Sequence, residues 1–305
     1  MHISDKITTK INQIILLFTL ITLGASFYFV HLLNLSNAKH ATISSLDTAM
    51  LLTKNLLEEE KQHALSLAVL LSRDSAFLKT YYAKNRTASF HILQSKIDML
   101  EKLQGYKIDI QVHDKDLHTY LRSWDFSIKD VPLASFRKDL VQVKRSRKPL
   151  VSIEVGKRFN IKAIAPILNK GAFDGSIEVI EGFSHLQKSL AEHGYTLFVL
   201  MYKRYLPIAT KLKKHPIFDN RFVVVNNISD TPSLHALRNI SLNKLENYGY
   251  IIKNDYSFGY FSIKDFQNQN IGYIIISMRN QTSLPKDSYG EKTLYHQNSS
   301  GVLIQ

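Results

Sequence analysis

The stretch VSIEVGKRFNIKAIAPILNKGAFDGSIEVI, Val151–Ile180, decides the fold of this chain. Two turn signals, Gly156–Lys157 and Asn169–Gly175, divide it into three segments. Apolar residues recur in each segment with a period of two, at Val151, Ile153 and Val155, then at Ile161, Ala163 and Ala165, then at Ile177 and Val179. Such alternation is typical of strands with one buried face, so the stretch predicts an antiparallel meander of three strands.

Residues N-terminal to this meander predict the rest of an α+β module. A helical run, Thr87–Leu103, precedes Ile108–Val112, where apolar and polar residues alternate. The sequence HDKD then predicts a turn into a second strand, Leu117–Trp124, and hence a hairpin. A further helix, Leu133–Arg147, is expected to end before Pro149. Helix, hairpin, helix and meander together predict an α+β module built on an antiparallel sheet.

A second, smaller module of the same class is predicted after residue 195. Its strands are expected at Thr196–Tyr205, Phe222–Val225, Gly249–Asn254, Tyr256–Ile263 and Gly272–Ser277, with helices near Ile208–Lys214 and Ser233–Asn239. The last hairpins of the two modules read GAFDGSIEVI and QNQNIGYIII, which places Gly175 against Gly272 and favours an internal duplication. The polar tail at 281–305 lacks periodicity and is expected to be disordered.

An apolar segment near the N-terminus predicts a membrane helix. No residue from Ile11 to Ala38 is charged, and the core of this segment, Ile14–Leu33, is long enough to cross a bilayer. Lys6 and Lys10 precede it, so the positive-inside rule leaves the N-terminus in the cytoplasm and the bulk of the chain outside. We therefore expect a cytoplasmic tail at 1–10, a membrane helix at 11–34, a stalk helix with the first module at 35–194 and the second module at 195–280.

A cleaved signal peptide is the alternative interpretation of the apolar segment. Ser36 and Ala38 form a small-x-small site, but the apolar run is longer than the core of an ordinary signal peptide, which favours an uncleaved anchor. Helical periodicity continues from Ser36 to about Tyr82 without proline or glycine. This predicts a stalk helix that continues the membrane helix.

The bulk composition excludes several classes of function. The chain has 305 residues and no cysteine, so disulfides, thiol catalysis and cysteine-ligated metals are excluded. Its net charge of +13 suits an anionic membrane surface as well as nucleic acid, and an extracytoplasmic location argues against a nucleic-acid partner. The sequence contains no GxSxG, HExxH or glycine-rich phosphate loop, so neither an enzymatic activity nor a cofactor is predicted.

The stretch Leu117–Ile180 contains YLRSWD, ASFRKDLVQVKRSRKPLVSIEVG, IKAIAPI and GAFDGSIEV, and it resembles the double Cache sensory domains of bacterial chemoreceptors, sensor kinases and diguanylate cyclases. The layout is similar over about residues 35–280: a membrane helix, a long stalk helix, a membrane-distal module and a smaller membrane-proximal module. The resemblance implies a periplasmic sensor in the cell membrane that binds a small molecule in its distal module. It also implies a homodimer through the stalk helices.

Double Cache receptors normally continue into a second membrane helix and a cytoplasmic output module. No apolar run of bilayer length follows Ser277. We therefore expect either a truncated chain or a sensor-only protein that signals through a cytoplasmic or membrane partner. An adaptor that holds a membrane partner without binding a small ligand is the alternative function.

The resemblance also implies a ligand site around TYLRSWDF, Thr119–Phe126. In double Cache domains that bind amino acids, an Arg-x-Trp element holds the ligand carboxylate, and Arg122 and Trp124 match it. Asp174 lies in the last hairpin, where an ammonium-binding aspartate of the family would be sought. The same stretch adds the candidates Tyr120, Asp125 and Phe126, with Asp125 standing where the amino-acid pattern usually has an aromatic residue.

Two further candidates, Glu154 and Arg158, flank the neighbouring turn and could face the same cavity. Ordinary packing is the alternative for the whole set: Trp124 could lie under the sheet edge, and Arg122 could pair with Asp125 or Glu154. The candidate ligand is a carboxylate or an amino acid.

Two polar motifs have simpler explanations. HDKDLH, His113–His118, contains two imidazoles and two carboxylates that could surround a metal, but a polar turn explains the same residues. KRSRK, Lys144–Lys148, could bind a polyanion, but cations at the end of a helix also complement its dipole. No metal site is predicted.

Overall fold

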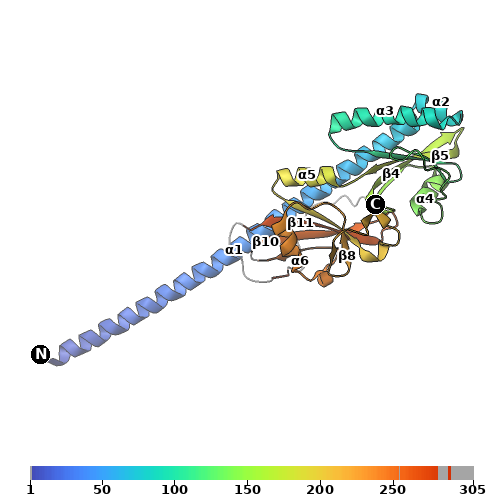
Figure 1. Ribbon diagram of the computed structural model, residues 1–305. Helices are drawn as coiled ribbons and strands as arrows, with labels where there is room; N and C mark the ends of the chain where they lie inside the picture. Colours follow the sequence, from blue (N-terminus) through green and yellow to red (C-terminus); the bar gives the residue numbers. More distant parts are fainter. Residues whose placement is uncertain (1, 254, 281–287, 290–305) are drawn as a thin grey trace.

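The computed structural model describes residues 2–253, 255–280 and 288–289. A single long helix runs the length of the molecule, and two α/β modules lie along its C-terminal half (Figure 1). The N-terminal half of the helix projects away from both modules (Figure 1). The tail predicted to be disordered falls outside the described residues, except for Ser288–Tyr289, which form the short strand β12.

The long helix α1 spans His2–Ser72. It contains one window apolar and long enough to cross a membrane, with a mean hydropathy of 2.0 and none of it buried within the described part of the chain. The predicted end of the stalk near Tyr82 is wrong. The side chain of Asp74 accepts a hydrogen bond from the Phe77 backbone N–H at 2.9 Å and starts a separate helix, α2 (Ser75–Tyr82).

The first module begins with α3 (Arg86–Gln104), which ends at Gly105 in the left-handed conformation, with φ of 74°. Its five-stranded antiparallel sheet has the order β2-β1-β5-β4-β3. The strands are β1 (Asp109–Asp114), β2 (Thr119–Arg122), β3 (Leu150–Val155), β4 (Phe159–Asn169) and β5 (Ala172–Glu181). The predicted hairpin and the three-strand meander are both confirmed.

The helix predicted at Leu133–Arg147 is shorter than expected. Only α4 (Lys138–Ser146) is α-helical, and Arg137 just before it has a non-helical backbone, with φ of −103° and ψ of 80°. The buried side chain of Arg137 pairs with carboxylates of the sheet and of α4. The segment before it, 134–136, forms a turn instead of continuing the helix.

The helix α5 (Ser184–Glu192), which the sequence pattern did not reveal, connects the first module to the second. The second sheet has seven strands in the order β12-β9-β10-β11-β6-β8-β7. They include β6 (Thr196–Tyr202), β7 (Ile217–Phe218), β8 (Phe222–Val224), β9 (Tyr248–Ile252), β10 (Tyr256–Lys264) and β11 (Asn270–Arg279). The helix α6 (Thr231–Arg238) is confirmed, whereas the helix predicted near Ile208–Lys214 is only a 3₁₀ turn, η2 (Thr210–Leu212).

The two sheets share one topology. The order β2-β1-β5-β4-β3 in the first sheet corresponds to β8-β6-β11-β10-β9 in the second, strand for strand. The hairpins β4–β5 and β10–β11 occupy equivalent places, and each has a register irregularity just before its glycine, Gly175 or Gly272. The duplication predicted from these hairpins is therefore present in the fold.

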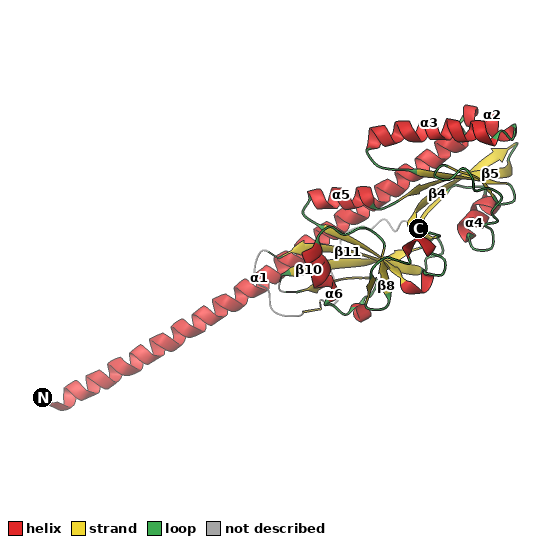
Figure 2. Cartoon of the chain, in the orientation of Figure 1, coloured by secondary structure: helices red, strands yellow, loops and turns green. Residues whose placement is uncertain are grey.

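One apolar face of each sheet packs against α1 (Figure 2). The other face of the second sheet is also apolar and carries a separate buried cluster that includes Phe198 and Phe258. Met50 contacts the second module, where its side chain fills the space above Gly259, and Ala64 and Ala68 lie against the first module. One continuous core joins both modules through this helix, since Ala49, Ala68, Ile161 and Val199 all belong to the same buried cluster. The opposite face of the first sheet carries the polar residues.

Candidate ligand site

The face of the first sheet turned away from α1 is unusually polar for a buried surface. Strand alternation and the register of the ladders place the odd-numbered residues of β1 and the even-numbered residues of β3, β4 and β5 on this face. The buried polar residues that result are Asp109, Gln111, His113, Ser152, Glu154, Asn160, Lys162, Ser176 and Glu178. The helix α4 and the loop before it cover them (Figure 1).

A β-bulge brings Arg122 and Thr119 to the same face. Gln111 pairs with Arg122 and His113 pairs with Thr119, so Tyr120 is the extra residue of β2. The Arg122 Nε–H donates to Gln111 Oε1 at 3.1 Å, and the guanidinium also donates to Thr119 Oγ1 at 3.4 Å. Arg122 is only 6% exposed, and these two contacts hold its guanidinium over the sheet.

A cavity of about 110 Å³ lies over this part of the sheet. Its lining contains no aspartate or glutamate. It contains six cationic side chains: Arg122, Arg137, Lys157, Arg158, Lys162 and Lys211. Val131, Leu133, Phe136 and Ile180 supply apolar wall, and Trp124 lies close to two of the cations. A volume of this size corresponds to about four water molecules, so the cavity suits a small anion.

Three cations of this cavity, Lys157, Lys162 and Lys211, have no side-chain partner among the described residues, and of these only Lys162 is buried. Lys162 is 5% exposed and forms no hydrogen bond or ion pair with the described residues. Burial, and then the nearby charge of Arg137, lower the pKa of Lys162 to about 8. A buried ammonium group without a paired anion is costly, and an anionic ligand in the cavity would relieve that cost.

The neighbouring charges are already paired with one another. Arg137 binds Asp139 at 2.8 Å and also forms an ion pair with Glu178. Burial alone would raise the pKa of Glu178, but the charge of Arg137 outweighs it and holds that pKa well below its usual range. His113 Nε2 lies 3.3 Å from Glu178, and burial lowers the pKa of this histidine. This network keeps Glu178 ionised and fixes Arg137 at the edge of the cavity.

Three of the eight candidate residues line the cavity. Arg122, Trp124 and Arg158 come together there, with the Arg158 guanidinium 5.1 Å and the Arg122 guanidinium 5.7 Å from the Trp124 ring. Arg158 also forms an ion pair with Asp109. The pairing of Arg122 with Asp125 or Glu154 that packing alone would have allowed is not formed in the described structure.

The structure places the other five candidates elsewhere. Tyr120 packs edge-on against Tyr81 with ring centroids 5.0 Å apart, and Asp174 accepts a hydrogen bond from the Tyr81 hydroxyl through its backbone carbonyl at 2.7 Å. The Asp125 side chain accepts a hydrogen bond from the Ser127 hydroxyl at 2.6 Å.

Phe126 and Glu154 complete this group. The Phe126 ring lies 4.8 Å from the Phe90 ring on α3. Glu154 Oε1 accepts hydrogen bonds from the Ser152 hydroxyl at 2.7 Å and from the Phe266 backbone N–H at 3.1 Å, and so joins the two modules. Burial, and then Asp139, raise the pKa of Glu154 to about 7.

Sequence reasoning missed Gln111, Arg137 and Lys162. Lys162 had a signal in the sequence, because it is the charged residue at a polar position of the apolar segment IKAIAPI. Arg137 had none, since it was assigned to the interior of a helix.

In the HDKDLH motif, His113 is buried against Ser176 and Glu178, whereas His118 lies near Asp114 on a half-exposed turn. Among the described residues no group of three or more possible metal ligands converges there or elsewhere.

Comparison with known families identifies this architecture. The family model described as "Double sensory domain of two-component sensor kinase" matches residues 39–282. The chain belongs to this double Cache family. Its two sheets of common topology are therefore the paired sensory modules of a Cache protein.

Solved structures align with this chain at low sequence identity. The extracellular domain assigned to the histidine kinase vpHK1S-Z8 matches with a TM-score of 0.51 and 15% identity, over 81% of this chain and 94% of that chain. The sensor domain of the V. cholerae histidine kinase DctB matches with a TM-score of 0.47 and 10% identity, over 79% of this chain and 98% of that chain.

A chemoreceptor gives a comparable match. The sensory domain of the Campylobacter jejuni chemoreceptor Tlp3 aligns with a TM-score of 0.43 and 13% identity, over 80% of this chain and 95% of that chain, and it has also been solved with isoleucine bound. The comparison with curated proteins found no match. As a member of this family, the chain is a double sensory domain.

Proposed function

We propose that this Cache protein is a membrane-anchored extracytoplasmic sensor that binds a small carboxylate in the cavity of its first module. The observation that carries the proposal is the buried, unpaired Lys162 in a cavity without a lining carboxylate. Arg122 also lines this cavity, its guanidinium is bonded to no carboxylate, and a guanidinium matches the two oxygens of a carboxylate.

The same cavity disfavours an amino acid. An amino acid brings an ammonium group as well as a carboxylate, and a buried ammonium needs an anionic or carbonyl partner. Two carboxylates of this face, Asp109 and Glu178, are already paired with Arg158 and Arg137. A monocarboxylate or dicarboxylate is therefore the better ligand than a zwitterion.

The anchor follows from α1 and the order of its charges. Lys6 and Lys10 precede the apolar window, which favours a cytoplasmic N-terminus and periplasmic modules. Leu51 and Leu70 on the same helix are 61% and 69% exposed, and pairing of two stalks in a homodimer would cover them. A cytoplasmic or membrane partner would then read the helix position, as in chemotaxis or sensor-kinase signalling.

The loop over the cavity offers a route from ligand to stalk. Leu133 and Phe136 of this loop line the cavity, and Arg86 of α3 holds it by donating to the Ile128 carbonyl at 3.0 Å. The other face of the same strands packs against α1. A ligand that draws the loop and sheet together would thus shift the sheet against the stalk helix.

Replacing Arg122 tests the proposal. The full chain in lipid nanodiscs is titrated with small monocarboxylates and dicarboxylates, with calorimetry and Trp124 fluorescence as readouts. We expect Arg122→Ala to weaken any carboxylate that binds the wild type by about tenfold or more, because a charge-assisted hydrogen bond is lost. Lys115→Ala, at the exposed β1–β2 turn, is the matched control and should bind like the wild type.

Two results would count against this proposal. One is a folded wild-type chain that binds no carboxylate of the panel; if it also purified in a stable complex with a membrane partner, the adaptor function would be favoured. The other is an unchanged affinity in Arg122→Ala.

A further inference from the structure

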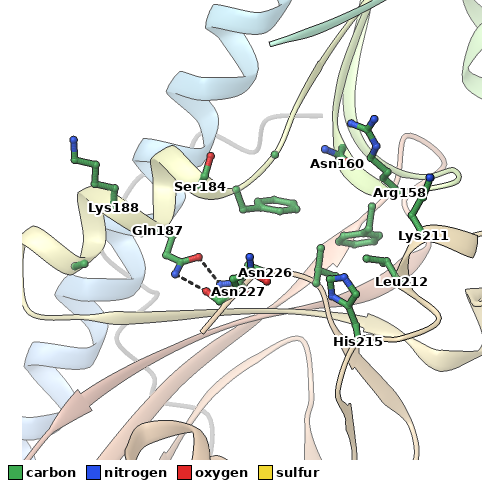
Figure 3. Close-up of a pocket in the computed structure, with 15 residues that line it drawn as sticks. Arg158, Asn160, Ser184, Gln187, Lys188, Lys211, Leu212, His215, Asn226 and Asn227 are labelled. Atoms are coloured by element: carbon green, nitrogen blue, oxygen red, sulfur yellow. Dashed lines mark hydrogen bonds between the residues drawn. The ribbon is translucent and has the colours of Figure 1, made fainter. Parts of the chain in front are cut away.

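A second and larger hollow lies between the two modules (Figure 3). This inter-module groove has a volume of about 640 Å³, which is within the range of small-molecule sites. Its walls come from the end of the β3–β4 turn and the start of β4 at Arg158–Asn160, the start of α5 at Gly182–Ser184, and two segments of the second module, 211–215 and 225–227. It is therefore a place where one ligand could touch both modules.

The charge of the inter-module groove has one sign. None of its lining residues is an aspartate or glutamate. Four of them are basic: Arg158, Lys188, Lys211 and His215. Arg158 and Lys211 lie together at one end of the groove, and the Lys211 backbone N–H is bonded to the Lys157 carbonyl at 3.0 Å (Figure 3). The side chains of Lys188 and Lys211 form no ion pair within the described part of the chain.

Fixed amide groups line the middle of the groove. The Gln187 side chain donates to the Asn227 carbonyl at 2.6 Å and accepts from the Asn226 side chain at 2.9 Å (Figure 3). Asn226 is held further by the Leu197 carbonyl at 2.8 Å, and Asn160 donates to the Glu181 carbonyl at 3.1 Å. These contacts leave the Asn227 amide, and the Asn160 side-chain oxygen, without a partner among the described residues.

The floor of the groove is apolar. The rings of Phe159 and Phe183 have centroids 6.1 Å apart and are almost fully buried, and Leu212 and Val225 continue this surface. An apolar floor with cations at one end and hydrogen-bonding amides beside it matches an organic anion with an apolar body. A free phosphate or other small inorganic ion would leave the floor uncovered.

We propose that the inter-module groove is a second binding site, for an organic carboxylate with an aromatic or branched apolar body. The carboxylate would lie between Arg158 and Lys211, and the apolar body over Phe159 and Phe183. Because Arg158 and Lys211 also line the cavity of the first module, a ligand here would adjust the wall shared by both sites. It would also connect the first module to the second directly.

Phenylacetate is a suitable probe, because it is too large for the cavity of about 110 Å³ in the first module. The full chain in nanodiscs is titrated calorimetrically with phenylacetate and with its neutral analogue phenylacetamide. We expect phenylacetate to bind, phenylacetamide to bind at least about tenfold more weakly, and Lys211→Gln to weaken phenylacetate about tenfold. Lys213→Gln, a change of the same charge on an exposed neighbour, should have no effect.

A repulsive variant isolates the groove from the cavity. Ala191→Glu places a carboxylate on the wall of the groove, whereas His193→Glu adds the same charge at an exposed residue outside its lining. We expect only the first to weaken phenylacetate, and we expect phenylacetate to bind Arg122→Ala as it binds the wild type. Failure of phenylacetate to bind, equal binding of the amide, or insensitivity to both Lys211→Gln and Ala191→Glu would overturn this site. None of these results depends on whether a smaller carboxylate binds through Arg122.

Discussion

Glu181 shows how a single residue can make the stability of this protein depend on pH. It ends β5 and faces Glu60 and His63 of α1 and Tyr106 after α3, and Glu60 in turn pairs with His185 of α5. Its Oε1 atom is buried without a hydrogen bond, as is Oε2 of Glu60. Burial, and then the charge of Glu60, raise the pKa of Glu181 from 4.5 to about 8. Near neutral pH this side chain is therefore mainly protonated in the folded protein.

This shift predicts a pH-dependent stability. Below pH 4.5 Glu181 is protonated in the folded and unfolded chains alike; between 4.5 and about 8 only the folded chain keeps the proton. The free energy of unfolding should therefore fall as pH rises through this range, by up to about 1.4 kcal/mol per pH unit from this group. Urea denaturation at several pH values across this range should show that the free energy of unfolding falls less steeply with pH for Glu181→Gln than for the wild type. Glu192→Gln, at an exposed residue, is the control and should behave like the wild type. The same pH dependence in Glu181→Gln and the wild type would refute the raised pKa of Glu181.

At the scale of elements, the two equivalent hairpins depend on their glycines for the same reason. A Cβ at Gly175 would collide with the His113 carbonyl oxygen of β1, and a Cβ at Gly272 would collide with the Leu200 carbonyl of β6. Each glycine follows a register irregularity in its hairpin, where the backbone approaches the neighbouring strand closely. The similarity between these hairpins in the sequence therefore reflects one packing requirement that both sheets share.

Alanine at either glycine should destabilise its module. We expect Gly175→Ala and Gly272→Ala each to lower the free energy of unfolding by about 1–3 kcal/mol, because the backbone atoms they meet cannot move aside easily. Gly182→Ala is the control, since its Cβ would lie 3.8 Å from the Asn160 amide nitrogen, an ordinary contact. Chemical denaturation gives the free energy of unfolding of all three variants. Equal values for the two variants and the control would refute the close backbone approach at Gly175 and Gly272.

At the scale of the whole molecule, α1 connects every part of the chain. Its N-terminal half is apolar and free of contacts with the modules, and its C-terminal half passes through the core of both (Figure 1). Glu154 and Phe266 add a second link between the modules, away from the helix. A change in the first module therefore reaches the stalk through the shared core and the second module through this link.

The absence of cysteine from the chain allows a direct test of its orientation in the membrane. A single cysteine at the exposed Lys115, in the β1–β2 turn, should react with a membrane-impermeant maleimide once the outer membrane is permeabilised. A cysteine at Lys6 should react only after lysis, because the positive-inside rule places it in the cytoplasm. The reverse pattern would contradict the proposed topology.

Local patterns were sufficient for most of the fold. The strands of the meander alternate strictly, so Val151–Ile180 predicted its own pairing, and the similar hairpins around Gly175 and Gly272 predicted the duplication. The predicted helix boundaries were wrong at two places where a single side chain determines where a helix begins or ends. Asp74 caps a new helix inside the expected stalk, and Arg137 stays outside the expected α4. Neither effect has a periodic signal.

The sequence by itself determined the class of this protein: an apolar N-terminal helix, a stalk and two antiparallel modules of the double Cache kind. Within the site, it pointed to Arg122 and Trp124 because both lie in one short segment. Only the tertiary structure could add Arg137, bring it together with Lys162 from a distant part of the chain, and place Tyr120 and Asp174 outside the cavity. Strand register and one bulge decide which side chains share a face, and those long-range pairings leave no local pattern.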